Sequence, residues 1–462
     1  MEQATLERPI ATRSSLPPGP RLPGLLQGIR YSRDPIGFFA GLQRRYGDTF
    51  SVTFPYFGRV VYVADPELVK RVFTADPARF HAGEANATVL EPALGPNSVL
   101  TLDEGDHLRQ RKLLLPPFHG ERVRRYGELM GEITQHDIET WPLGEPFALR
   151  PHTQRITLAV ILRAVFGVSD AERFARAALL VDTFARRSNR IIQMPFLRRN
   201  LGRFGPWARF QRARAELDEF IYEEIAARRA EADGGERDDV LSLLLGAEHE
   251  DGSPMSDEEL RDELVTVVGA GHETTATALA WALERLLRAP RVLARLRESI
   301  VNGDDDYLDA TIKETLRVRP VIVDVARKLT APAEVGGYEL PAGTFVLPAI
   351  AAMHYREDVY PDPHEFRPER FLDGSGDKYT WIPFGGGVRR CIGAAFAQYE
   401  MRVVLRTILE RAELSAPDPR PEKVKVRNIT LAPGEGGRVV LERRLDRAPS
   451  VQPADARSAQ RA

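Results

Sequence analysis

The chain has 462 residues, of which 43% are hydrophobic and 28% are charged, a balance typical of a globular protein with a large apolar core. This composition argues against a largely disordered chain, and the formal net charge of −2 gives no electrostatic reason to expect nucleic-acid binding. No linker-like composition divides the middle of the chain, so we expect one domain at residues 21–445 rather than the roughly two or three that the length would allow. We expect residues 1–20 to be a flexible N-terminal segment and residues 446–462, rich in Ala, Pro, Ser, Gln and Arg, to be a disordered tail.

The N-terminus carries Glu2, Glu7 and Arg8 and no apolar run, so we expect neither a signal peptide nor a transmembrane anchor. A membrane-spanning helix needs about 18 uncharged apolar residues. The longest candidate, Leu158 to Val168, is interrupted by Arg163. A lone cysteine fits a reducing compartment, and we expect a cytoplasmic protein. No GxGxxG pattern follows a predicted strand, so no bound nucleotide or flavin is expected.

In the first quarter of the chain, Pro17-Pro-Gly-Pro20 is a stiff, extended segment that should mark the start of the ordered body. Thr49 to Phe54 and Arg59 to Val63 read as two strands around a turn, which predicts a β-hairpin. Asp65 then opens a helix. A small sheet is therefore expected near the start of the domain.

Helical patterns dominate from about Ile156 to Leu287, and strands return around Val335 to Leu347. Two segments beside the helical part resemble access elements, namely the loop Gly83 to Asp106 and the link Met194 to Trp207 between two helices. Their apolar side chains would line an entrance or touch a membrane surface. Ordinary loop packing explains any single one of these residues equally well.

One predicted helix is unusually long and has an unusual centre. Ser256-Asp-Glu-Glu259 forms a capping box, and the apolar spacing continues from it towards Pro290. Ala270-Gly-His-Glu-Thr-Thr275 then places a glycine, a carboxylate and two β-branched hydroxyls at mid-helix, where each is less favourable than alanine. Gly271 alone costs about 1 kcal/mol and favours a local distortion. The alternative is a surface Glu273 beside packing threonines.

A charged pair follows on a later helix. Glu314-Thr-Leu-Arg317 places a carboxylate and a guanidinium three residues apart, on a helix that must stop before Pro320. Most pairs of this kind are solvated and weak. Further along, Phe366-Arg-Pro-Glu-Arg-Phe371 lies in a proline-rich stretch and supplies Arg370.

Cys391 is the only cysteine, which excludes a disulfide within the chain. It lies in Phe384-Gly-Gly-Gly-Val-Arg-Arg-Cys-Ile-Gly393, directly before an amphipathic helix pattern. Backbone N–H groups and the positive end of that helix would stabilise a thiolate, so the setting favours metal ligation. The alternative is a buried, inert thiol.

This loop resembles the Phe-x-x-Gly-x-Arg-x-Cys-x-Gly haem-binding loop of the cytochrome P450 family at five defined positions: Phe384, Gly387, Arg389, Cys391 and Gly393. Three further motifs occur in the order of that family, and the resemblance covers about residues 20 to 445. It implies a mainly α fold with small β-sheets. The cytochrome P450 fold has a triangular helical body, with haem between the long central helix and the helix after the cysteine loop.

In that family the cysteine thiolate is the axial ligand of the haem iron. The resemblance therefore implies that Cys391 holds iron protoporphyrin IX (haem b), with O2 as co-substrate. Glycines let the backbone approach the sulfur closely, so bulk at Gly387 or Gly393 should lower haem occupancy. Other residues that the resemblance places at the haem are Ala270, Phe384 and Gly385, together with the propionate-binding His107, Arg111, Arg327 and Arg389.

The centre of the long helix resembles the family's Ala/Gly-Gly-x-Asp/Glu-Thr-Thr pattern. By that resemblance Thr274 lies over the haem and contacts O2, while Glu273 relays protons for O–O cleavage. His272 points elsewhere on the helix and is interpreted as structural.

The Glu-x-x-Arg helix and the later arginine also match the family. They imply a buried network of Glu314, Arg317 and Arg370 that supports the cysteine loop from behind. On the cysteine side of the haem, the resemblance places five cations that would form a docking face for an acidic electron donor: Arg109, Lys112, Arg390, Arg402 and Arg406.

The resemblance implies a monooxygenase that hydroxylates or epoxidises a lipophilic substrate such as a sterol, fatty acid or terpenoid. Because no reductase domain is present, electrons would come from a ferredoxin or flavodoxin with its NAD(P)H reductase. We expect a monomer with no nucleic-acid partner. The pocket would be lined by Val267, Gly269, Ala270, Val321, Val323, Val325 and Thr430.

Two alternatives to this function stay open. One is a peroxide-driven hydroxylase of the same fold, which should not need the acid and alcohol of Glu273 and Thr274. The other is a haem-thiolate sensor or binding protein without turnover. Substrate-dependent O2 consumption with a reductase system separates the sensor from the enzyme.

Overall fold

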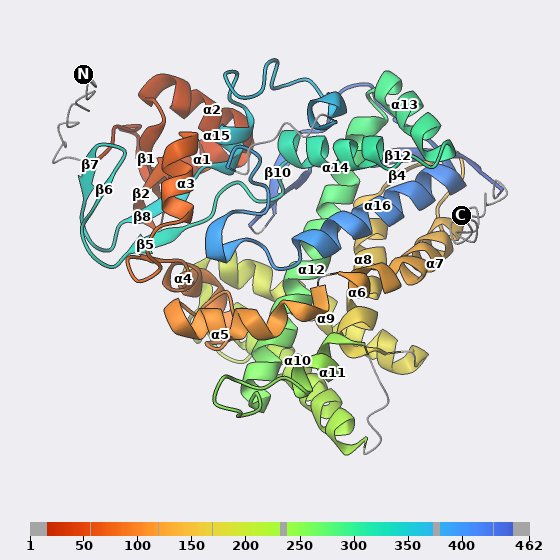
Figure 1. Ribbon diagram of the computed structural model, residues 1–462, viewed down its shortest axis with the longest axis horizontal. Coiled ribbons are helices and arrows are strands. Elements are labelled where there is room, and N and C mark those ends of the chain that lie inside the picture. Colours follow the sequence, from red (N-terminus) through yellow and green to blue (C-terminus); the bar gives the residue numbers. More distant parts are fainter. Residues whose placement is uncertain are drawn as a thin grey trace, which may run out of the picture.

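The computed structural model describes residues 16–55, 57–118, 120–168, 170–231, 238–372, 379–427 and 429–446. Almost all of the predicted C-terminal tail therefore lies outside the described residues, as do residues 1–15. The described chain is mainly helical with small sheets, which confirms the predicted fold class (Figure 1). Within the described ranges, every helix is too short or too polar to cross a membrane.

The helices are α1 (Gly24–Arg33), α2 (Pro35–Tyr46), α3 (Pro66–Phe73), α4 (Gly83–Leu94), α5 (Glu104–Leu114), α6 (Glu121–Arg125), α7 (Gly127–Glu139), α8 (Arg150–Phe166), α9 (Ala171–Gln193), α10 (Pro206–Ala230), α11 (Val240–Leu245), α12 (Asp257–Leu286), α13 (Pro290–Val301), α14 (Asp306–Val318), α15 (Ile350–His354) and α16 (Ala394–Arg411). Short 3-10 helices are η1 (Pro116–Phe118), η2 (Pro195–Leu197), η3 (Pro368–Phe371) and η4 (Gly387–Arg389). The strands are β1 (Thr49–Phe54), β2 (Gly58–Val63), β3 (Phe80–His81), β4 (Pro146–Ala148), β5 (Arg327–Leu329), β6 (Ala333–Val335), β7 (Tyr338–Leu340), β8 (Phe345–Pro348), β9 (Ala412–Ser415), β10 (Val424–Arg427), β11 (Thr430–Pro433) and β12 (Arg438–Arg444).

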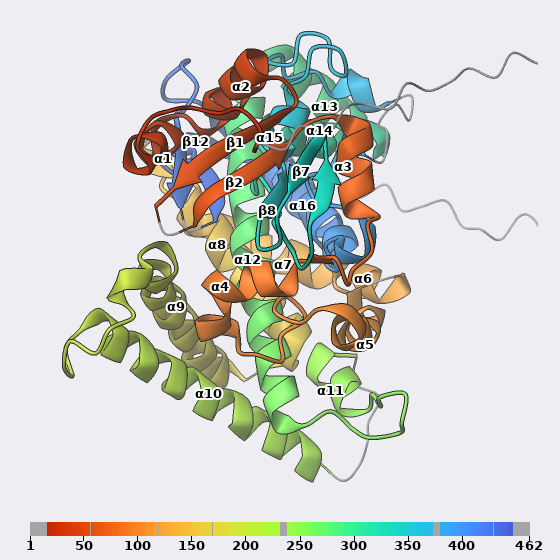
Figure 2. The ribbon, with the colours of Figure 1, turned by 90° about the vertical axis from the view of Figure 1, so that its left-hand side faces the viewer.

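The largest sheet has the order β1-β2-β8-β5-β3, and it lies at one end of the molecule (Figure 2). Its first two strands form the predicted hairpin, with Thr49 opposite Val63 and Phe54 opposite Gly58. Strand β8 pairs with β2 in parallel and with β5 antiparallel. The sheet thus joins the start of the chain to residues near 330–348.

The edge strand β1 is covered by the proline-rich segment before α1. The Ser51 N–H donates to the Pro18 carbonyl (2.8 Å), and the Ser51 hydroxyl donates to the Pro17 carbonyl (2.8 Å). Arg59 Nη2 donates to the same Pro17 oxygen at 2.8 Å. Residues 16–20, part of the segment predicted to be flexible, therefore lie bonded along β1.

Helix α12 crosses the whole molecule, from the sheet-bearing end to α10 (Figure 2). Its capping box is present, since the Glu259 N–H donates to Ser256 Oγ (3.2 Å) and the Ser256 N–H donates to Glu259 Oε2 (2.8 Å). The helix is α-helical without interruption, so the distortion predicted at Gly271 does not occur. The glycine has a packing reason instead, because a Cβ there would lie 2.9 Å from Ile161 Cδ1 of the adjacent α8.

The segment Gly83 to Asp106 was predicted to be a loop, and this prediction is wrong. It contains α4, whose first residue Gly83 follows Ala82, a residue without a capping side chain. The cap comes instead from Asp103, which accepts the N–H groups of Gly83 (2.8 Å) and Glu84 (2.7 Å). A cap supplied from about 20 residues away leaves no local sequence signal. The link Met194 to Trp207 does connect two helices, α9 and α10.

Candidate functional site

The cysteine loop is a tight turn closed by backbone hydrogen bonds. The Cys391 N–H donates to the Phe384 carbonyl at 2.9 Å, and the Gly385 N–H donates to the Ile382 carbonyl at 3.0 Å. Gly385 and Gly387 have φ values of +67° and +65°, a left-handed conformation that favours glycine. The loop therefore depends on glycine at both positions.

Two glycines of this loop differ in what surrounds them. A Cβ at Gly387 would overlap the backbone carbonyl oxygen of Phe73, at the end of α3. Gly393 has an ordinary φ of −81°, and a Cβ there would meet no atom within 4 Å. Bulk at Gly387 is thus excluded by the protein itself, whereas Gly393 borders open space.

Cys391 is exposed, although burial raises the pKa of its thiol. The Gly393 N–H and the charges of Arg390 and Arg111 act in the opposite direction and are outweighed. The predicted stabilisation of the thiolate by a backbone N–H group is therefore present at Gly393, but burial outweighs it. The thiol lies below the protein surface but borders open space, so its sulfur can be reached by a bound group. A metal ion bound there would deprotonate the thiol.

Four basic side chains lie close together beside this loop: His107 and Arg111 of α5, Arg327 of β5, and Arg389 of η4. Burial and the three guanidinium charges lower the pKa of His107 to about 3, so the imidazole is neutral. Burial also lowers the pKa values of Arg327 and Arg389 to about 10. Among the described residues, Asp103 is the one carboxylate that contacts this group, through Arg389. The cluster therefore holds a net positive charge in place.

The central helix presents an open face. Gly269 and Ala270 are exposed, although Leu264, Val268 and Thr275 along the same helix are buried. A Cβ at Gly269 would meet no atom within 4 Å. An exposed thiol, an open helix face and a cluster of cations fit an iron porphyrin that carries two carboxylates.

The predicted acid and alcohol of α12 lie next to this open face. Thr274 Oγ1 donates to the Ala270 carbonyl at 2.7 Å, which leaves its lone pairs free to accept. The Glu273 carboxylate turns towards α8, where it pairs with Arg150 and accepts a hydrogen bond from Gln154 Nε2 (2.6 Å). These two partners were not predicted, because nothing in the sequence of α8 shows which face meets α12.

A second carboxyl group near the centre of α12 was also missed. Glu400 of α16 is buried, and burial raises its pKa well above the usual value. It is hydrogen-bonded to Thr275, whose hydroxyl lies 3.1 Å from the Gly271 carbonyl. Glu400 lies four residues after Phe396, on the predicted apolar face of its helix. This position was the sequence signal that could have indicated a buried carboxyl group. This buried carboxyl group therefore connects the helix after the cysteine loop to the central helix.

The three predicted network residues lie together behind the loop. The fully buried Arg317 makes two hydrogen bonds to Glu314, at 2.7 and 2.8 Å, and Arg370 Nε lies 3.4 Å from the same carboxylate. Arg317 Nη1 also donates to the His354 carbonyl at 2.8 Å. The His354 ring accepts the Ile382 N–H at 3.1 Å, two residues before Phe384. A continuous path of contacts thus joins the network to the cysteine loop.

The residues predicted to line the substrate pocket divide into two groups. Gly269 and Ala270 are exposed, and Val267 and Val325 are half-buried. The remaining three are buried, with the two valines in apolar clusters: Val321, Val323 and Thr430.

The cations predicted to form a docking face mostly have carboxylate partners. Arg109 pairs with Asp106 at 2.7 Å and Arg402 with Asp309 at 2.6 Å. Lys112 and Arg406 are paired in the same way, with Glu250 and Asp305. The net positive charge of this face is therefore smaller than the sequence suggests.

The chain is similar to known proteins in both sequence and fold. The family model for "Cytochrome P450" matches residues 16–437. The chain is 43% identical over 446 residues to cytochrome P450 135B1 of Mycobacterium tuberculosis, covering 95% of this chain and 93% of that protein. It is 39% identical over 445 residues to cytochrome P450 138 of the same species, covering 96% and 100%.

Two solved structures are also similar. The retinoic acid-bound cyanobacterial CYP120A1 superposes with a TM-score of 0.79 at 26% identity, covering 93% of this chain and 100% of that chain. The haem domain of cytochrome P450DA superposes with a TM-score of 0.80 at 26% identity, covering 96% and 99%.

Proposed function

This chain belongs to the cytochrome P450 family of haem-thiolate monooxygenases, and from that premise we propose a lipophilic substrate and a separate ferredoxin or flavodoxin as electron donor. The observation that carries the proposal is the exposed Cys391 directly before α16, the helix whose Glu400 is hydrogen-bonded to Thr275 of α12. No nucleotide-binding GxGxxG pattern follows a strand in this sequence, which supports a separate protein as electron donor.

We propose that Cys391 is the thiolate ligand of the haem iron, and that His107, Arg111, Arg327 and Arg389 hold the two propionates. When bound, haem supplies the activation of O2. The neutral His107 can donate a hydrogen bond, while the three guanidiniums supply charge and paired N–H groups for carboxylates. Phe384, Gly385 and Gly393 would border the same group from the loop side.

The roles proposed for the α12 residues follow from their positions. Thr274 lies one turn after the exposed Ala270, so its hydroxyl can accept a hydrogen bond from water at the open face. It can donate to a small ligand there when it releases the Ala270 carbonyl. Glu273 holds its carboxylate against Arg150 and Gln154 of α8. We propose that Thr274 orients O2 or water and that Glu273 delivers protons to it from the α8 side.

The proposed substrate class rests on the apolar residues near the open face. Val267, Gly269 and Ala270 of α12 offer no charge, and Val325 adds a further apolar side chain. Such a pocket orients its ligand by shape with few polar contacts. The retinoic acid in the structure of CYP120A1 is a lipophilic molecule of the proposed kind. Hydroxylation or epoxidation of a sterol, fatty acid or terpenoid fits this pocket.

The test is the absorbance spectrum of the purified protein after reduction and addition of carbon monoxide. Thiolate ligation is expected to give a strongly red-shifted Soret band, and Cys391→Ser is expected to lose it. A histidine-like band, or a protein that takes up no haem, would refute the proposal. Substrate-dependent O2 consumption with a ferredoxin and its reductase then separates the enzyme from a haem-thiolate sensor.

A further inference from the structure

The segment 97–103 connects the central helix to the cysteine loop. On the helix side, Asp262 accepts the Asn97 N–H (2.9 Å) and the buried Glu263 accepts the Val99 N–H (2.8 Å). The hydroxyls of Ser98 and Thr266 lie 2.7 Å apart. Three consecutive residues of the segment are therefore bonded to α12.

At its other end the segment binds the cysteine loop through one guanidinium. Arg389 donates to the carbonyls of Val99 (3.2 Å) and Leu102 (2.5 Å) and to Asp103 Oδ1 (2.5 Å). Arg389 lies two residues before Cys391 in the sequence. The position of this guanidinium is thus set by the backbone and one carboxylate of the segment.

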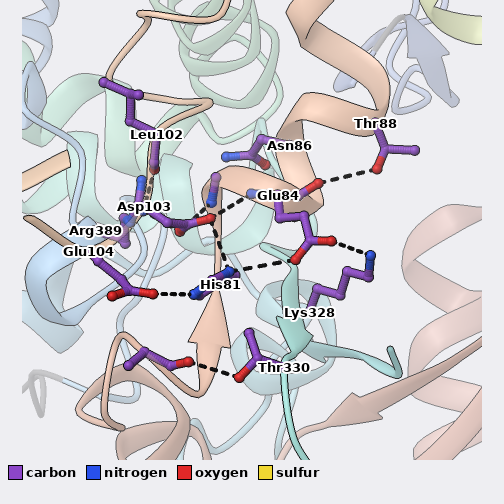
Figure 3. A network of polar contacts seen from close by, with 12 residues as sticks. His81, Glu84, Asn86, Thr88, Leu102, Asp103, Glu104, Lys328, Thr330 and Arg389 are labelled. Atoms are coloured by element: carbon purple, nitrogen blue, oxygen red, sulfur yellow. Dashed lines mark hydrogen bonds and ion pairs between the residues drawn. The ribbon is translucent and has the colours of Figure 1, made fainter. Parts of the chain in front are cut away.

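The Asp103 carboxylate has four partners (Figure 3). Besides Arg389, it accepts the N–H groups of Gly83 and Glu84 at the start of α4, and its Oδ2 lies 3.6 Å from His81 Nδ1. It is not used to cap α5, the helix that begins at the next residue. Its position is therefore determined by α4 and the cysteine loop together.

Further ionisable side chains surround His81, the fourth partner of this carboxylate (Figure 3). His81 Nε2 lies 2.9 Å from Glu104, and His81 Nδ1 lies 3.5 Å from Glu84, which pairs with Lys328. Glu104 itself has a φ of +49°, a left-handed conformation that is unfavourable for a non-glycine residue. Such strained residues cluster at functional sites, where the surrounding contacts hold them in place.

The charge of Asp103 matters because of where it lies. The cluster of His107, Arg111, Arg327 and Arg389 carries three guanidinium charges, and within the described residues Asp103 is the carboxylate in contact with it. The Asp103 side chain is 14% exposed and that of Arg389 is 13% exposed, so water screens the pair only weakly. A unit negative charge is therefore fixed beside the proposed propionate site.

We propose that Asp103 is a positioning residue that fixes Arg389 at the haem edge and, by its charge, sets the reduction potential of the haem. The inference rests on the proposed haem site. One-electron reduction of the iron adds a negative charge to the site without moving a proton. A fixed carboxylate nearby disfavours that added charge, and a free guanidinium favours it.

The experiment compares three variants with the parent haem protein. Asp103→Asn keeps the size of the side chain and one accepting oxygen, but it replaces the other oxygen with an NH2 group and removes the charge. It is expected to shift the haem reduction potential to a more positive value. Asp103→Glu retains the charge and is expected to return the potential towards that of the parent. The matched control is Asp106→Asn, which removes the same charge from the exposed Asp106–Arg109 pair of α5 and should leave the potential unchanged.

A second readout follows the positioning role directly. The rate of haem transfer from the ferric protein to an excess of apomyoglobin is expected to rise several-fold in Asp103→Asn and to stay at the parent value in Asp106→Asn. Circular dichroism and the melting temperature of each variant check that the fold is retained.

Two results would overturn the inference. One is an unchanged potential and haem-transfer rate in a folded Asp103→Asn that still shows the thiolate spectrum. The other is an equal shift in Asp103→Asn and Asp106→Asn, which would mean that only the overall charge matters. Failure of the proposed function is seen separately, as absence of the thiolate band in the parent protein.

Discussion

At Gly387 of the cysteine loop, a side chain is excluded both by the backbone conformation and by a neighbouring segment of the protein. Its φ is +65°, and a Cβ would overlap the Phe73 carbonyl oxygen. We predict that Gly387→Ala destabilises the protein by at least about 1–3 kcal/mol and lowers the haem-to-protein absorbance ratio.

The neighbouring Gly393 supplies the contrast. Because a Cβ there meets no atom within 4 Å, Gly393→Ala should melt like the parent. The larger Gly393→Leu should keep the fold but lose haem occupancy, since its side chain would enter the open space beside Cys391. Full haem occupancy in Gly393→Leu would contradict the prediction that haem lies in the space beside Gly393 and Cys391.

Thr274 provides a test of the chemistry at a single hydroxyl. If this group orients O2 or water, Thr274→Ala should consume NADPH at a comparable rate while more of the electrons appear as hydrogen peroxide. Paired assays of NADPH, peroxide and product measure the change in coupling. Thr274→Ser keeps the hydroxyl and is the control, expected to retain most of the coupling. Equal coupling in the parent and in Thr274→Ala would exclude the role.

At the scale of elements, the Glu314 network connects α14 to the cysteine loop through His354 and Ile382. Removing one member leaves an unpaired charge in a fully buried site. We predict that Glu314→Ala lowers the free energy of unfolding by roughly 3–5 kcal/mol and reduces haem retention. Denaturant titration and the absorbance ratio measure the two effects.

The control for this prediction is Arg295→Ala. Arg295 pairs with Glu369 at 2.7 Å, but its side chain is 51% exposed. A pair of this kind contributes about 1 kcal/mol or less. If both variants lost a similar free energy of unfolding, the Glu314 network would contribute no more than an exposed ion pair.

How much of an element can be predicted depends on where its stabilising contacts lie along the chain. The start of α12 was predicted because Ser256 and Glu259 form a local capping box. Helix α4 was missed because its cap is Asp103, and the short strands β9 to β12 were missed because strands of four to seven residues carry little periodicity. The β1–β2 hairpin, with a turn between alternating strands, was confirmed.

The candidate site shows the same division. The cysteine loop and the basic residues around it could be named because each belongs to a short motif with fixed spacing. Arg150, Asp103 and Glu400 belong to no such motif, although they are the partners of Glu273, Arg389 and Thr275. Only the packing of α8, α4 and α16 brings them to the site. Contacts between distant segments have no local signature in one sequence.

At the scale of the whole molecule, the buried His354 links stability to pH. Burial lowers the pKa of its imidazole to about 3, whereas in the unfolded chain it titrates near 6.5. Between these values the unfolded chain binds more protons, so the His354 contribution to stability is full above about pH 6.5 and is lost as the pH falls towards 3. The maximum loss is on the order of a few kcal/mol.

We therefore predict that the melting temperature of His354→Gln falls less steeply than that of the parent between pH 6.5 and pH 4. Burial raises the pKa values of Glu263 and Glu400, which contribute the opposite slope. The difference between variant and parent isolates His354. His136→Gln, at a side chain that is 85% exposed, is the control and should follow the parent. Parallel curves for parent and His354→Gln would contradict the prediction.

The proline-rich segment along β1 has a practical consequence for protein production. Three hydrogen bonds hold Pro17 and Pro18 to the outer edge of the largest sheet. An uncovered edge strand offers unpaired backbone groups to other chains and promotes aggregation. A recombinant form that starts at residue 21 should therefore aggregate more than one that starts at residue 16. Affinity tags belong upstream of Leu16, where they leave this edge covered.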